Sequence, residues 1–311
     1  MLNDYILNEY SIEPIESRTY YLLNQELLNY KKQLDEKSSN AISLRNIGIF
    51  FSYIKNGAFS RIIRRLKKAT HPDTALGYSL KNYSSFPKSK VVVYSCIWGP
   101  YDKIAEPLYY NPAIDYILVT DQEVPASSKW SKMNFPNVGL LDSMGPSAVN
   151  RYCKMMPHVL FPDYDYSIYI DGNIQIVTDL MPLIADLGEH TIGIHSYPVD
   201  CIYNMKNAII AGKKATKESL DCQIKNYKRE GFPKHYGAFE CNVLVRKHND
   251  NDIIKLMESW WEEYISTSSK RDQISLPYVL WKSNKTADFI YSLGPDVRLN
   301  PRFQLTVEHR K

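Results

Sequence analysis

The sequence lacks the features that would place it in a membrane or in an oxidising compartment. No stretch of its 311 residues approaches the roughly 18 consecutive apolar residues of a membrane-spanning helix. No basic segment followed by an apolar signal region lies near its start. The five cysteines are odd in number and widely spaced, so they form neither a zinc quartet nor an evident disulfide framework. We therefore expect a soluble or membrane-peripheral chain that works in a reducing cytoplasm.

Excess charge and phosphate-binding loops are also missing. Lysine and arginine number 38 against 34 aspartate and glutamate, and the net charge of +4 is too small to demand a nucleic-acid partner. A glycine-rich loop ending in Lys-Ser/Thr is absent, which counts against a P-loop protein. What is present is an ordinary globular balance, with 44% apolar and 23% charged residues, which suits one domain of catalytic size plus an appendage.

The composition changes near residue 87 and predicts two regions. Residues 1–87 are typical of a helical extension, because apolar side chains recur at helical spacing in residues 20–36 and again in 47–66. Residues 37–72 contain no aspartate or glutamate, so the second helix is basic and amphipathic. Such a helix suits an anionic membrane surface, the main domain, or a second copy of the chain as its partner. Residues 71–87 are predicted to form a linker.

Residues 88–311 alternate strand and helix patterns, which predicts an α/β layer fold. The continuous apolar run at residues 91–97 is typical of a strand buried on both faces of a parallel sheet. The further predicted strands are 116–120, 138–141, 167–170, 191–195, 242–245 and 289–292. The predicted helices are 147–160, 214–229, 252–265 and 272–281. In such sheets ligands bind beyond the carboxyl ends of the strands, so polar residues that follow strands are the first site candidates.

The sequence Asp171-Gly172-Asn173 follows one of these apolar strands. Asp171 and Asn173 supply hard oxygen ligands suited to Mg²⁺ or Mn²⁺, and an ion held there would bridge a substrate diphosphate. Gly172 allows close approach of a ligand to the backbone. The same tripeptide is also an excellent turn, because Asp and Asn bond readily to their own backbone.

A basic helix face precedes this strand. Ser147 is expected to cap the helix, on which Arg151, Lys154 and His158 follow on one side, and Pro157 is expected to end or kink it. Arg151 and Lys154 can hold phosphate oxygens, the arginine as a two-pronged donor. A solvated basic face is the alternative.

Two strand exits offer a site for a nucleotide base. Trp98 and Tyr101 follow the first strand, and Asp121 follows the second, so all three are expected at the same sheet edge. An aromatic ring stacks on a base, and a carboxylate accepts hydrogen bonds from a base or ribose. Either segment is also compatible with a plain turn.

Four ordered motifs resemble a known family, the glycosyltransferase-like domain shared by bacterial polysaccharide loci and plant mucilage and pectin proteins. The motifs are SCIWGPYD at 95–102, NRYCK at 150–154 with His158 and LFP at 160–162, YIDGN at 169–173, and RDQISLPY at 271–278. The resemblance covers about residues 90–282. It implies a GT-A fold, the Rossmann-like fold of nucleotide-diphosphosugar transferases with a mixed sheet flanked by helices. It also implies a nucleotide-sugar donor, with Gln273 among its contacts, and a divalent metal. GT-A enzymes commonly carry Asp-x-Asp at the strand end, whereas this chain has Asn173 in the last place.

Sugar transfer also needs a base for the acceptor hydroxyl if the reaction inverts the anomeric carbon. Glu240, just before a predicted strand, and Asp272, at the start of a predicted helix, are the candidates. Asp272 is equally suited to cap its helix. His195 follows another strand and is a candidate contact to the donor, the acceptor or the metal, although a lone histidine there is more often structural.

Together these features predict a GT-A glycosyltransferase domain at residues 88–311 behind a helical region at 1–87. We expect it to move a sugar from a nucleotide donor to a surface polysaccharide or a lipid-linked glycan, with Mn²⁺ or Mg²⁺ as cofactor. The expected location is the cytoplasm or the inner face of the cell membrane, with no nucleic-acid partner and with the N-terminal helices available for homo-oligomer contacts. The alternatives are a catalytically silent GT-A-like module that binds glycan or protein, and a metal-dependent phosphoryl or nucleotidyl transferase.

Overall fold

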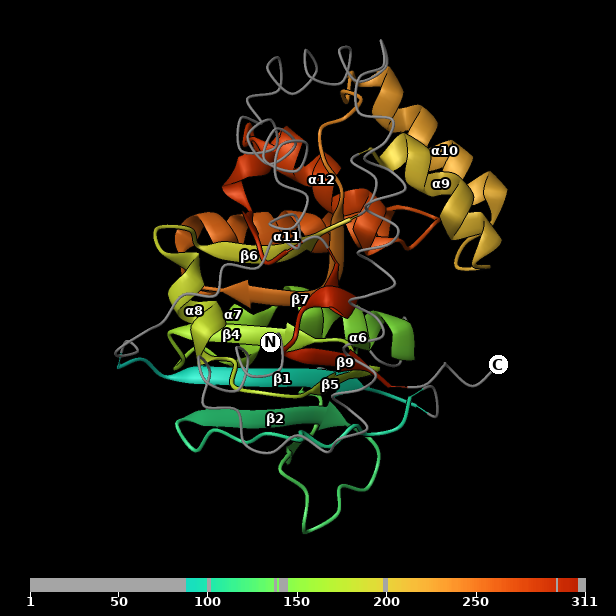
Figure 1. The fold of residues 1–311 in the computed structure, drawn as a ribbon. Coiled ribbons are helices and arrows are strands. Elements are labelled where there is room, and N and C mark those ends of the chain that lie inside the picture. The colour runs from blue at the N-terminus through green and yellow to red at the C-terminus, as the bar shows by residue number, and fades with distance from the viewer. Residues whose placement is uncertain are drawn as a thin grey trace, which may run out of the picture.

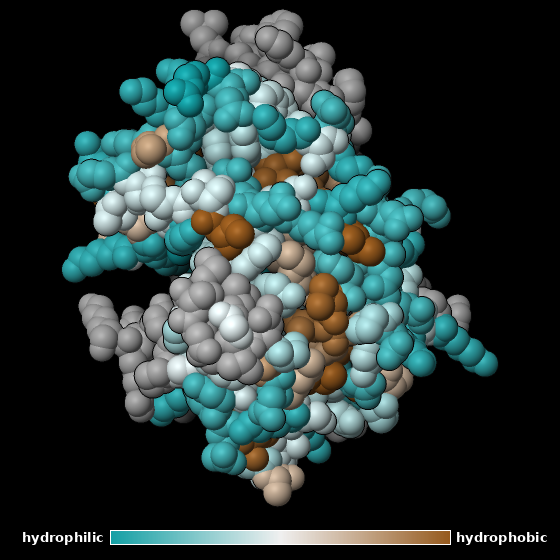
Figure 2. All heavy atoms as spheres, turned by 180° about the vertical axis from the view of Figure 1, so that it is seen from behind, coloured by the Kyte–Doolittle hydropathy of each residue, from teal (hydrophilic) through white to brown (hydrophobic). Residues whose placement is uncertain are grey.

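The computed structural model describes residues 88–99, 102–136, 139, 145–197, 201–294 and 296–306, and their arrangement is shown in Figure 1. The predictions for residues 1–87 and the position of Tyr101 lie outside these described residues. Among the helices of the described part, none combines the length and apolar character that crossing a bilayer requires. Seen from behind, the surface is largely hydrophilic, with apolar patches between the polar side chains (Figure 2).

A seven-stranded mixed sheet forms the centre of the fold. In spatial order its strands are β3 (Ser131–Met133), β2 (Ile114–Thr120), β1 (Val91–Ile97), β4 (Tyr166–Ile170), β7 (Phe239–Arg246), β6 (Ile192–Ser196) and β8 (Tyr291–Ser292). Strands β3, β2, β1 and β4 are parallel, whereas β7 runs antiparallel to both of its neighbours, β4 and β6. A separate antiparallel pair consists of β5 (Ile174–Ile176) and β9 (Phe303–Leu305).

Helices cover both faces of the sheet. They are α6 (Pro146–Met155), α7 (Pro157–Leu160), α8 (Met181–Leu187), α9 (Ile202–Ala211), α10 (Lys217–Arg229), α11 (Asn251–Ser266) and α12 (Asp272–Lys282). One apolar core joins the sheet to α6, α11 and α12, and a second joins its other face to α8 and the β5–β9 pair. The prediction of an α/β fold with a mixed, helix-flanked sheet is therefore confirmed.

Strand β1 shows why the core divides in this way. All seven of its residues are buried, and successive side chains point to opposite faces. Val92, Tyr94 and Cys96 belong to the first core, and Val91 and Val93 belong to the second. The continuous apolar run therefore serves both cores, as expected for a central parallel strand.

Several element boundaries differ from the prediction. Helix α6 begins with Pro146 after Gly145, and no side chain caps it, so Ser147 is not its cap. Proline suits the first helical position because its fixed φ is already helical and its missing N–H is not needed there. The predicted break before Pro157 is confirmed. The predicted strand at 289–292 shortens to β8 because a 3-10 turn occupies Ala287–Phe289. The predicted strand at 138–141 lies almost wholly outside the described residues.

The direction of β7 decides what meets at the carboxyl edge of the sheet. Because β7 is antiparallel to β4 and β6, its first residues lie where its two neighbours end. The backbone N–H of Asp171, just past β4, donates to the carbonyl of Asn242 at 2.8 Å. In the register of the sheet, Glu240 of β7 pairs with His195 of β6. The exits of β4 and β6 and the entry of β7 thus share one edge.

Candidate active site

Lys154 lies at the centre of a buried charge cluster at this edge. Its Nζ is 3.0 Å from Oδ1 of Asp171 and 2.8 Å from Oδ2 of Asp272, and only 1% of its side chain is exposed. The Nζ atom also lies 5.1 Å from the centre of the Tyr169 ring, on β4. One ammonium therefore ties the last turn of α6 to the end of β4 and the start of α12. A buried charge of this kind is tolerated only when it is paired and hydrogen-bonded.

Arg151, one turn before Lys154 on α6, shares the same carboxylate. Its Nε is 3.1 Å from Oδ2 of Asp272. Burial alone would raise the pKa of Asp272, but the charges of Arg151, Lys154 and Arg271 hold it well below its usual range. The buried guanidinium of Arg151 has its pKa raised by the same carboxylate, against the opposing effect of burial. Both helix cations are therefore already neutralised by carboxylates.

Asp171 is the more accessible carboxylate, with 29% of its side chain exposed. Its Oδ1 accepts a hydrogen bond from the hydroxyl of Tyr169 at 2.9 Å in addition to the contact with Lys154. Asn150 braces the same region, because its Nδ2 donates to the carbonyl of Cys96 at 2.7 Å and its Oδ1 accepts from Arg151. Asp171 is thus fixed on one side and open to a ligand on the other.

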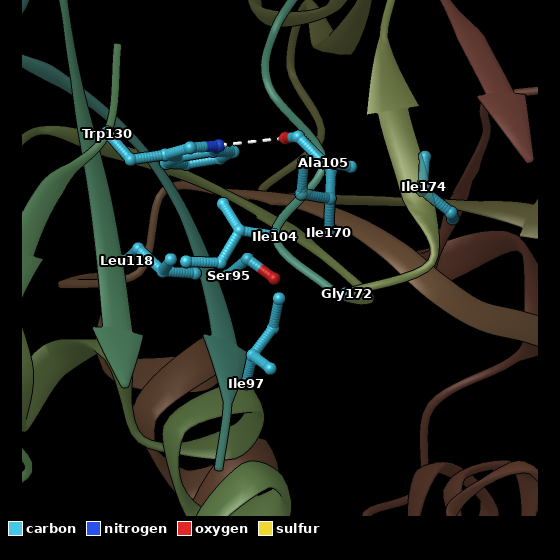
Figure 3. A pocket seen from close by; sticks show the side chains of 9 residues that line it. All are labelled: Ser95, Ile97, Ile104, Ala105, Leu118, Trp130, Ile170, Gly172 and Ile174. Atoms are coloured by element: carbon cyan, nitrogen blue, oxygen red, sulfur yellow. Dashed lines mark hydrogen bonds between the residues drawn. The ribbon is translucent and has the colours of Figure 1, made fainter. Parts of the chain in front are cut away.

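Position 172 leaves no room for a side chain, which explains the glycine there. A Cβ built at Gly172 would lie 2.8 Å from Cγ1 of Ile97 and 3.1 Å from Oδ2 of Asp102. Figure 3 shows the narrow apolar crevice beside it, whose walls include Ile97, Trp130 and Ile170. No water molecule fits inside this crevice, so it is part of the packing. The ligand face of the tripeptide must be the polar one, toward Asp171 and Asn173.

The turn after β4 fits a divalent ion only in part. Asp171 and Asn173 present hard oxygens on one turn, but among the described residues no group of three His, Cys, Asp or Glu side chains is placed to hold an ion. Lys154 already lies against Asp171 and would repel a second cation. An ion would therefore need diphosphate oxygens and water as its remaining ligands, which is how Mg²⁺ is commonly held.

The exits of β1 and β2 meet, as predicted for Trp98 and Asp121. Both carboxylate oxygens of Asp121 accept from the backbone N–H of Gly99, at 3.0 and 3.1 Å, and Gln122 Nε2 donates to the carbonyl of Gly99 at 2.8 Å. The Trp98 ring packs edge-on against Phe135, with 5.9 Å between ring centres. Asp121 therefore stabilises the turn after β1, because both of its carboxylate oxygens accept from the backbone N–H of Gly99.

Glu240, on β7, is a buried carboxylate whose surroundings shift its pKa upward. Only 4% of the residue is exposed, and its Oε2 accepts from the backbone N–H of Val297 at 3.0 Å. Burial and the nearby charge of Asp296 raise the pKa of Glu240 to about 7, although Val297 and Arg298 oppose the shift. Arg298 Nη1 lies 3.7 Å from Oε1. A carboxylate with this pKa can accept and release a proton near neutral pH.

His195 is enclosed by protein and not open to a ligand. It has no exposed surface, and burial lowers its pKa to about 3. Its Nε2 accepts from Nδ2 of Asn300 at 3.0 Å, because Oδ1 of Asn300 is taken by the N–H of Arg302. No hydrogen-bond partner of its Nδ1 appears among the described residues. We therefore interpret His195 as an uncharged, buried side chain that packs beside Glu240.

His158 does not lie with Arg151 and Lys154, whereas Asp272 lies at the start of a helix as predicted. His158 Nε2 lies 3.7 Å from Oε1 of Glu258 on α11, away from the charge cluster, because the chain turns at Met156 before α7 begins. Asp272 is the first residue of α12, not its cap. Its two ion pairs and low pKa make it a poor proton acceptor, so its geometry favours an anchor for Arg151 and Lys154. Gln273 lies beside it, with Oε1 3.4 Å from Nη2 of Arg271.

Sequence reasoning missed part of the site. Arg271, directly before Asp272, and Arg298, whose Nη1 lies 3.7 Å from Oε1 of Glu240, bring two more cations to this edge, and Tyr169 and Asn150 orient Asp171. Arg271, Tyr169 and Asn150 stand inside the motifs that carried the family resemblance, so position in the motif was the available signal. Nothing in the sequence around Arg298 marks it, because only the tertiary fold brings it to the site.

Comparison with known proteins identifies relatives of the chain. The family described as "TOD1/MUCI70, glycosyltransferase-like domain" matches residues 144–307, slightly more than half of the sequence. A curated relative from Arabidopsis thaliana, named "Probable hexosyltransferase MUCI70", is 23% identical over 219 residues. That alignment covers 61% of this chain and 37% of the relative, so the chain spans little more than a third of that protein's length.

Solved structures of two glycosyltransferases resemble the fold loosely. The bifunctional glycosyltransferase WbbM is 13% identical, with a TM-score of 0.38, over 68% of this chain and 40% of its own. Mouse xyloside xylosyltransferase 1 is 11% identical, with a TM-score of 0.39, over 66% of this chain and 84% of its own. Superpositions this loose do not align individual site residues.

Proposed function

The chain belongs to the TOD1/MUCI70 family of glycosyltransferase-like domains, and from this premise we propose that it is a glycosyltransferase of GT-A type. It takes a sugar from a nucleotide donor and attaches it to a hydroxyl of a surface polysaccharide or lipid-linked glycan. A hexose is the proposed sugar, in keeping with the name of the Arabidopsis relative. The observation that carries the proposal is the open carboxylate of Asp171 at the carboxyl edge of the sheet, fixed by buried Lys154.

The charge cluster fixes Asp171, the proposed ligand of an ion that would face the donor diphosphate. Breaking the bond between the anomeric carbon and the phosphate oxygen leaves positive character on the sugar and negative charge on the diphosphate. Asp171, held by Lys154 and Tyr169, is fixed before the substrate arrives, so little reorganisation is needed in the transition state. Asp272 holds Lys154 and Arg151 in place from behind and acts as a positioning residue.

Glu240 is the proposed base for an inverting transfer. As the acceptor oxygen bonds to the anomeric carbon, the hydroxyl proton passes to the Glu240 carboxylate, and the nucleoside diphosphate leaves with the bonding electron pair. The pKa of about 7 suits this exchange at neutral pH. The charge of Asp296 raises the pKa of Glu240 and the charge of Arg298 lowers it, so both protonation states are populated near neutral pH.

A divalent ion is proposed as a cofactor through Asp171 and Asn173. When bound, Mn²⁺ or Mg²⁺ supplies positive charge to the diphosphate. The oxygens of the two side chains suit either ion, while the lysine beside Asp171 weakens the attraction. We propose, accordingly, modest affinity for the free ion and tighter binding together with the nucleotide.

Donor hydrolysis and nucleotide titration test the enzyme proposal. The intact chain is titrated with UDP, GDP, CDP and ADP in the presence of Mn²⁺, and the corresponding hexose donors are assayed for slow hydrolysis. Asp171→Ala should abolish hydrolysis while the protein stays folded, because Asp272 still pairs with Lys154, whereas the exposed control Asp163→Ala should keep full activity. A folded wild-type chain that binds none of the nucleotides refutes the proposal, and so does full activity of Asp171→Ala.

A catalytically silent module that binds glycan or protein is the second candidate. Asn173, where GT-A enzymes commonly have an aspartate, and the lysine against Asp171 both favour it, because each weakens a metal site. The same assays separate the two candidates: nucleotide or glycan binding with no hydrolysis of any donor supports the silent module.

Membrane attachment is proposed for residues 1–87, with the cytoplasmic face of the membrane as the location. The support is the acid-free basic pattern at residues 37–72. Vesicles containing anionic lipid should pellet the wild-type chain and release a variant with Arg61, Arg64 and Arg65 changed to Glu. Equal pelleting of both refutes membrane attachment and points to oligomer contacts instead, which sedimentation velocity measures.

A further inference from the structure

The break between α6 and α7 leaves two helix carbonyls without their usual partners. In a continuous helix the carbonyl of Cys153 would accept from the N–H of the residue four positions later, but Pro157 has none. The carbonyl of Lys154 would accept from the N–H of His158, but the chain leaves the helical conformation at Met156, with φ −116° and ψ 47°. Unpaired carbonyls in the interior are costly, so other donors must meet them.

Two buried side chains of the sheet supply these donors. The hydroxyl of Tyr94, in the middle of β1, donates to the carbonyl of Cys153 at 3.0 Å. Nη1 of Arg246, the last residue of β7, donates to the carbonyl of Lys154 at 2.7 Å. Nη2 of the same guanidinium donates to the hydroxyl of Tyr94 at 2.7 Å, so the two side chains form one network. Both side chains are fully buried.

The charge of Arg246 is unusual for a residue that only fills space. No carboxylate pairs with it among the residues that the structure describes, and its Nε has no hydrogen-bond partner there. The carbonyl end of the α6 dipole faces the guanidinium and offsets part of the cost of burying it. An apolar side chain of similar size would usually be no less stable in such a place. The guanidinium therefore has a role beyond packing.

Lys154 is the residue whose backbone Arg246 contacts and whose ammonium lies in the site. Its Nζ lies 3.0 Å from Asp171 and 2.8 Å from Asp272. Arg246 reaches Lys154 from the opposite edge of the sheet, because it pairs with Ser167 near the start of β4, whereas Asp171 follows the end of β4. The guanidinium thus fixes the backbone from which the lysine extends to the charge cluster.

We propose that Arg246 and Tyr94 are positioning residues for sugar transfer, which act through Lys154 to fix Asp171. This assignment rests on the proposed function and explains how its central carboxylate is kept in place. Asp171 needs a fixed position because the groups that meet the developing charge of the diphosphate must be oriented before the reaction. A displacement of the α6 end by about 1 Å would carry the ammonium with it, and misplacement of that size costs about 10²-fold in rate.

Donor hydrolysis by variants of the intact chain tests the assignment, with the hexose nucleotide that the wild type hydrolyses fastest. Tyr94→Phe keeps the ring and removes the hydroxyl, and it should lower kcat by about 10²-fold without changing the KM for the donor. Arg246→Gln should lose at least as much turnover. Arg246→Lys keeps the charge and a donor for the Lys154 carbonyl, so it should recover part of the loss.

Tyr203→Phe is the matched control. The hydroxyl of Tyr203, on α9, also donates to a backbone carbonyl, that of Phe232 at 2.7 Å. Its removal should leave turnover at the wild-type level. Circular dichroism of every variant at the assay temperature shows that the protein is folded, and Tyr94→Phe keeps the test valid if Arg246→Gln does not fold.

A crystal structure of Tyr94→Phe separates positioning from a purely structural role. It should show the Lys154 ammonium displaced from the 3.0 Å contact with Asp171. Full turnover of folded Tyr94→Phe and Arg246→Gln overturns the assignment, and so does lost turnover with this contact unmoved; the enzyme proposal survives either result. A wild type that hydrolyses no donor refutes the enzyme proposal instead, and the crystal structure still decides whether Tyr94 and Arg246 position Lys154.

Discussion

Replacing Glu240 by glutamine should change how the stability of the protein depends on pH. The pKa of this buried carboxyl group is raised from 4.5 to about 7 by burial and by Asp296. Ionising it in the folded protein is therefore harder than in the unfolded chain, and the difference corresponds to about 3 kcal/mol. Glutamine has nearly the same shape, keeps an acceptor for the N–H of Val297, and never ionises.

The sign of the effect follows from the order of the two pKa values. Below pH 4.5 the carboxyl group is protonated in both states, so wild type and Glu240→Gln should be about equally stable. As the pH rises from 4.5 toward 7, the unfolded chain ionises first, and the wild type loses stability. Above that window the variant should be the more stable protein by up to about 3 kcal/mol.

Urea unfolding across this pH range, followed by circular dichroism, measures the difference. The exposed residue Glu189 provides the control, because Glu189→Gln should leave the pH dependence unchanged. Parallel stability curves for wild type and Glu240→Gln would refute the raised pKa. In the donor assay, the variant should also lose about 10²- to 10⁴-fold in turnover if the residue is the base. Full turnover of the variant would remove that role while leaving the stability argument intact.

Three further changes probe the charge cluster and the turn. Lys154→Met should cost about 1.5–3 kcal/mol in urea unfolding, because it removes a charge-assisted hydrogen bond to buried Asp272 while Arg151 still pairs with that carboxylate. Adding Asp272→Asn should cost less than the sum of the two single changes, and strict additivity would contradict the coupling. Gly172→Ala should cost about 1–3 kcal/mol, since its Cβ would meet Ile97 at 2.8 Å, and wild-type stability would show that the crevice yields. Asn173→Asp should tighten Mn²⁺ binding in calorimetry with a nucleotide present, and an unchanged affinity would mean that residue 173 is not a ligand.

The central fold followed directly from patterns in the sequence. The apolar run of β1 and the strand that delivers Asp171 were predicted because buried parallel strands leave continuous apolar stretches. The break before Pro157 followed from the missing N–H of proline. The β5–β9 pair and the antiparallel direction of β7 were not predicted, because strand direction and pairing of distant three-residue strands depend on tertiary contacts.

For the site, the sequence identified residues but not their partners. It placed Arg151, Lys154 and Asp171 at one edge, and the structure brings them together. It assigned the two cations to phosphate, whereas both contact the carboxylate of Asp272, which lies 118 residues from Lys154 in sequence. Lys154 also contacts Asp171. Which cation meets which anion is decided by long-range packing, and local spacing carries no information about it.

The link between Lys154 and Asp272 also has a consequence for how the protein is made. When the chain has emerged from the ribosome up to residue 270, the sequences of α6, β4 and β7 are all outside it. Asp272, the second of the two carboxylates that contact Lys154, has not yet emerged. The strand β9 emerges later still, and until then the backbone of β5 has no pairing partner in its sheet. The nascent chain therefore holds an incompletely neutralised interior cation until Asp272 has emerged, and an open strand edge until Phe303–Leu305 have emerged.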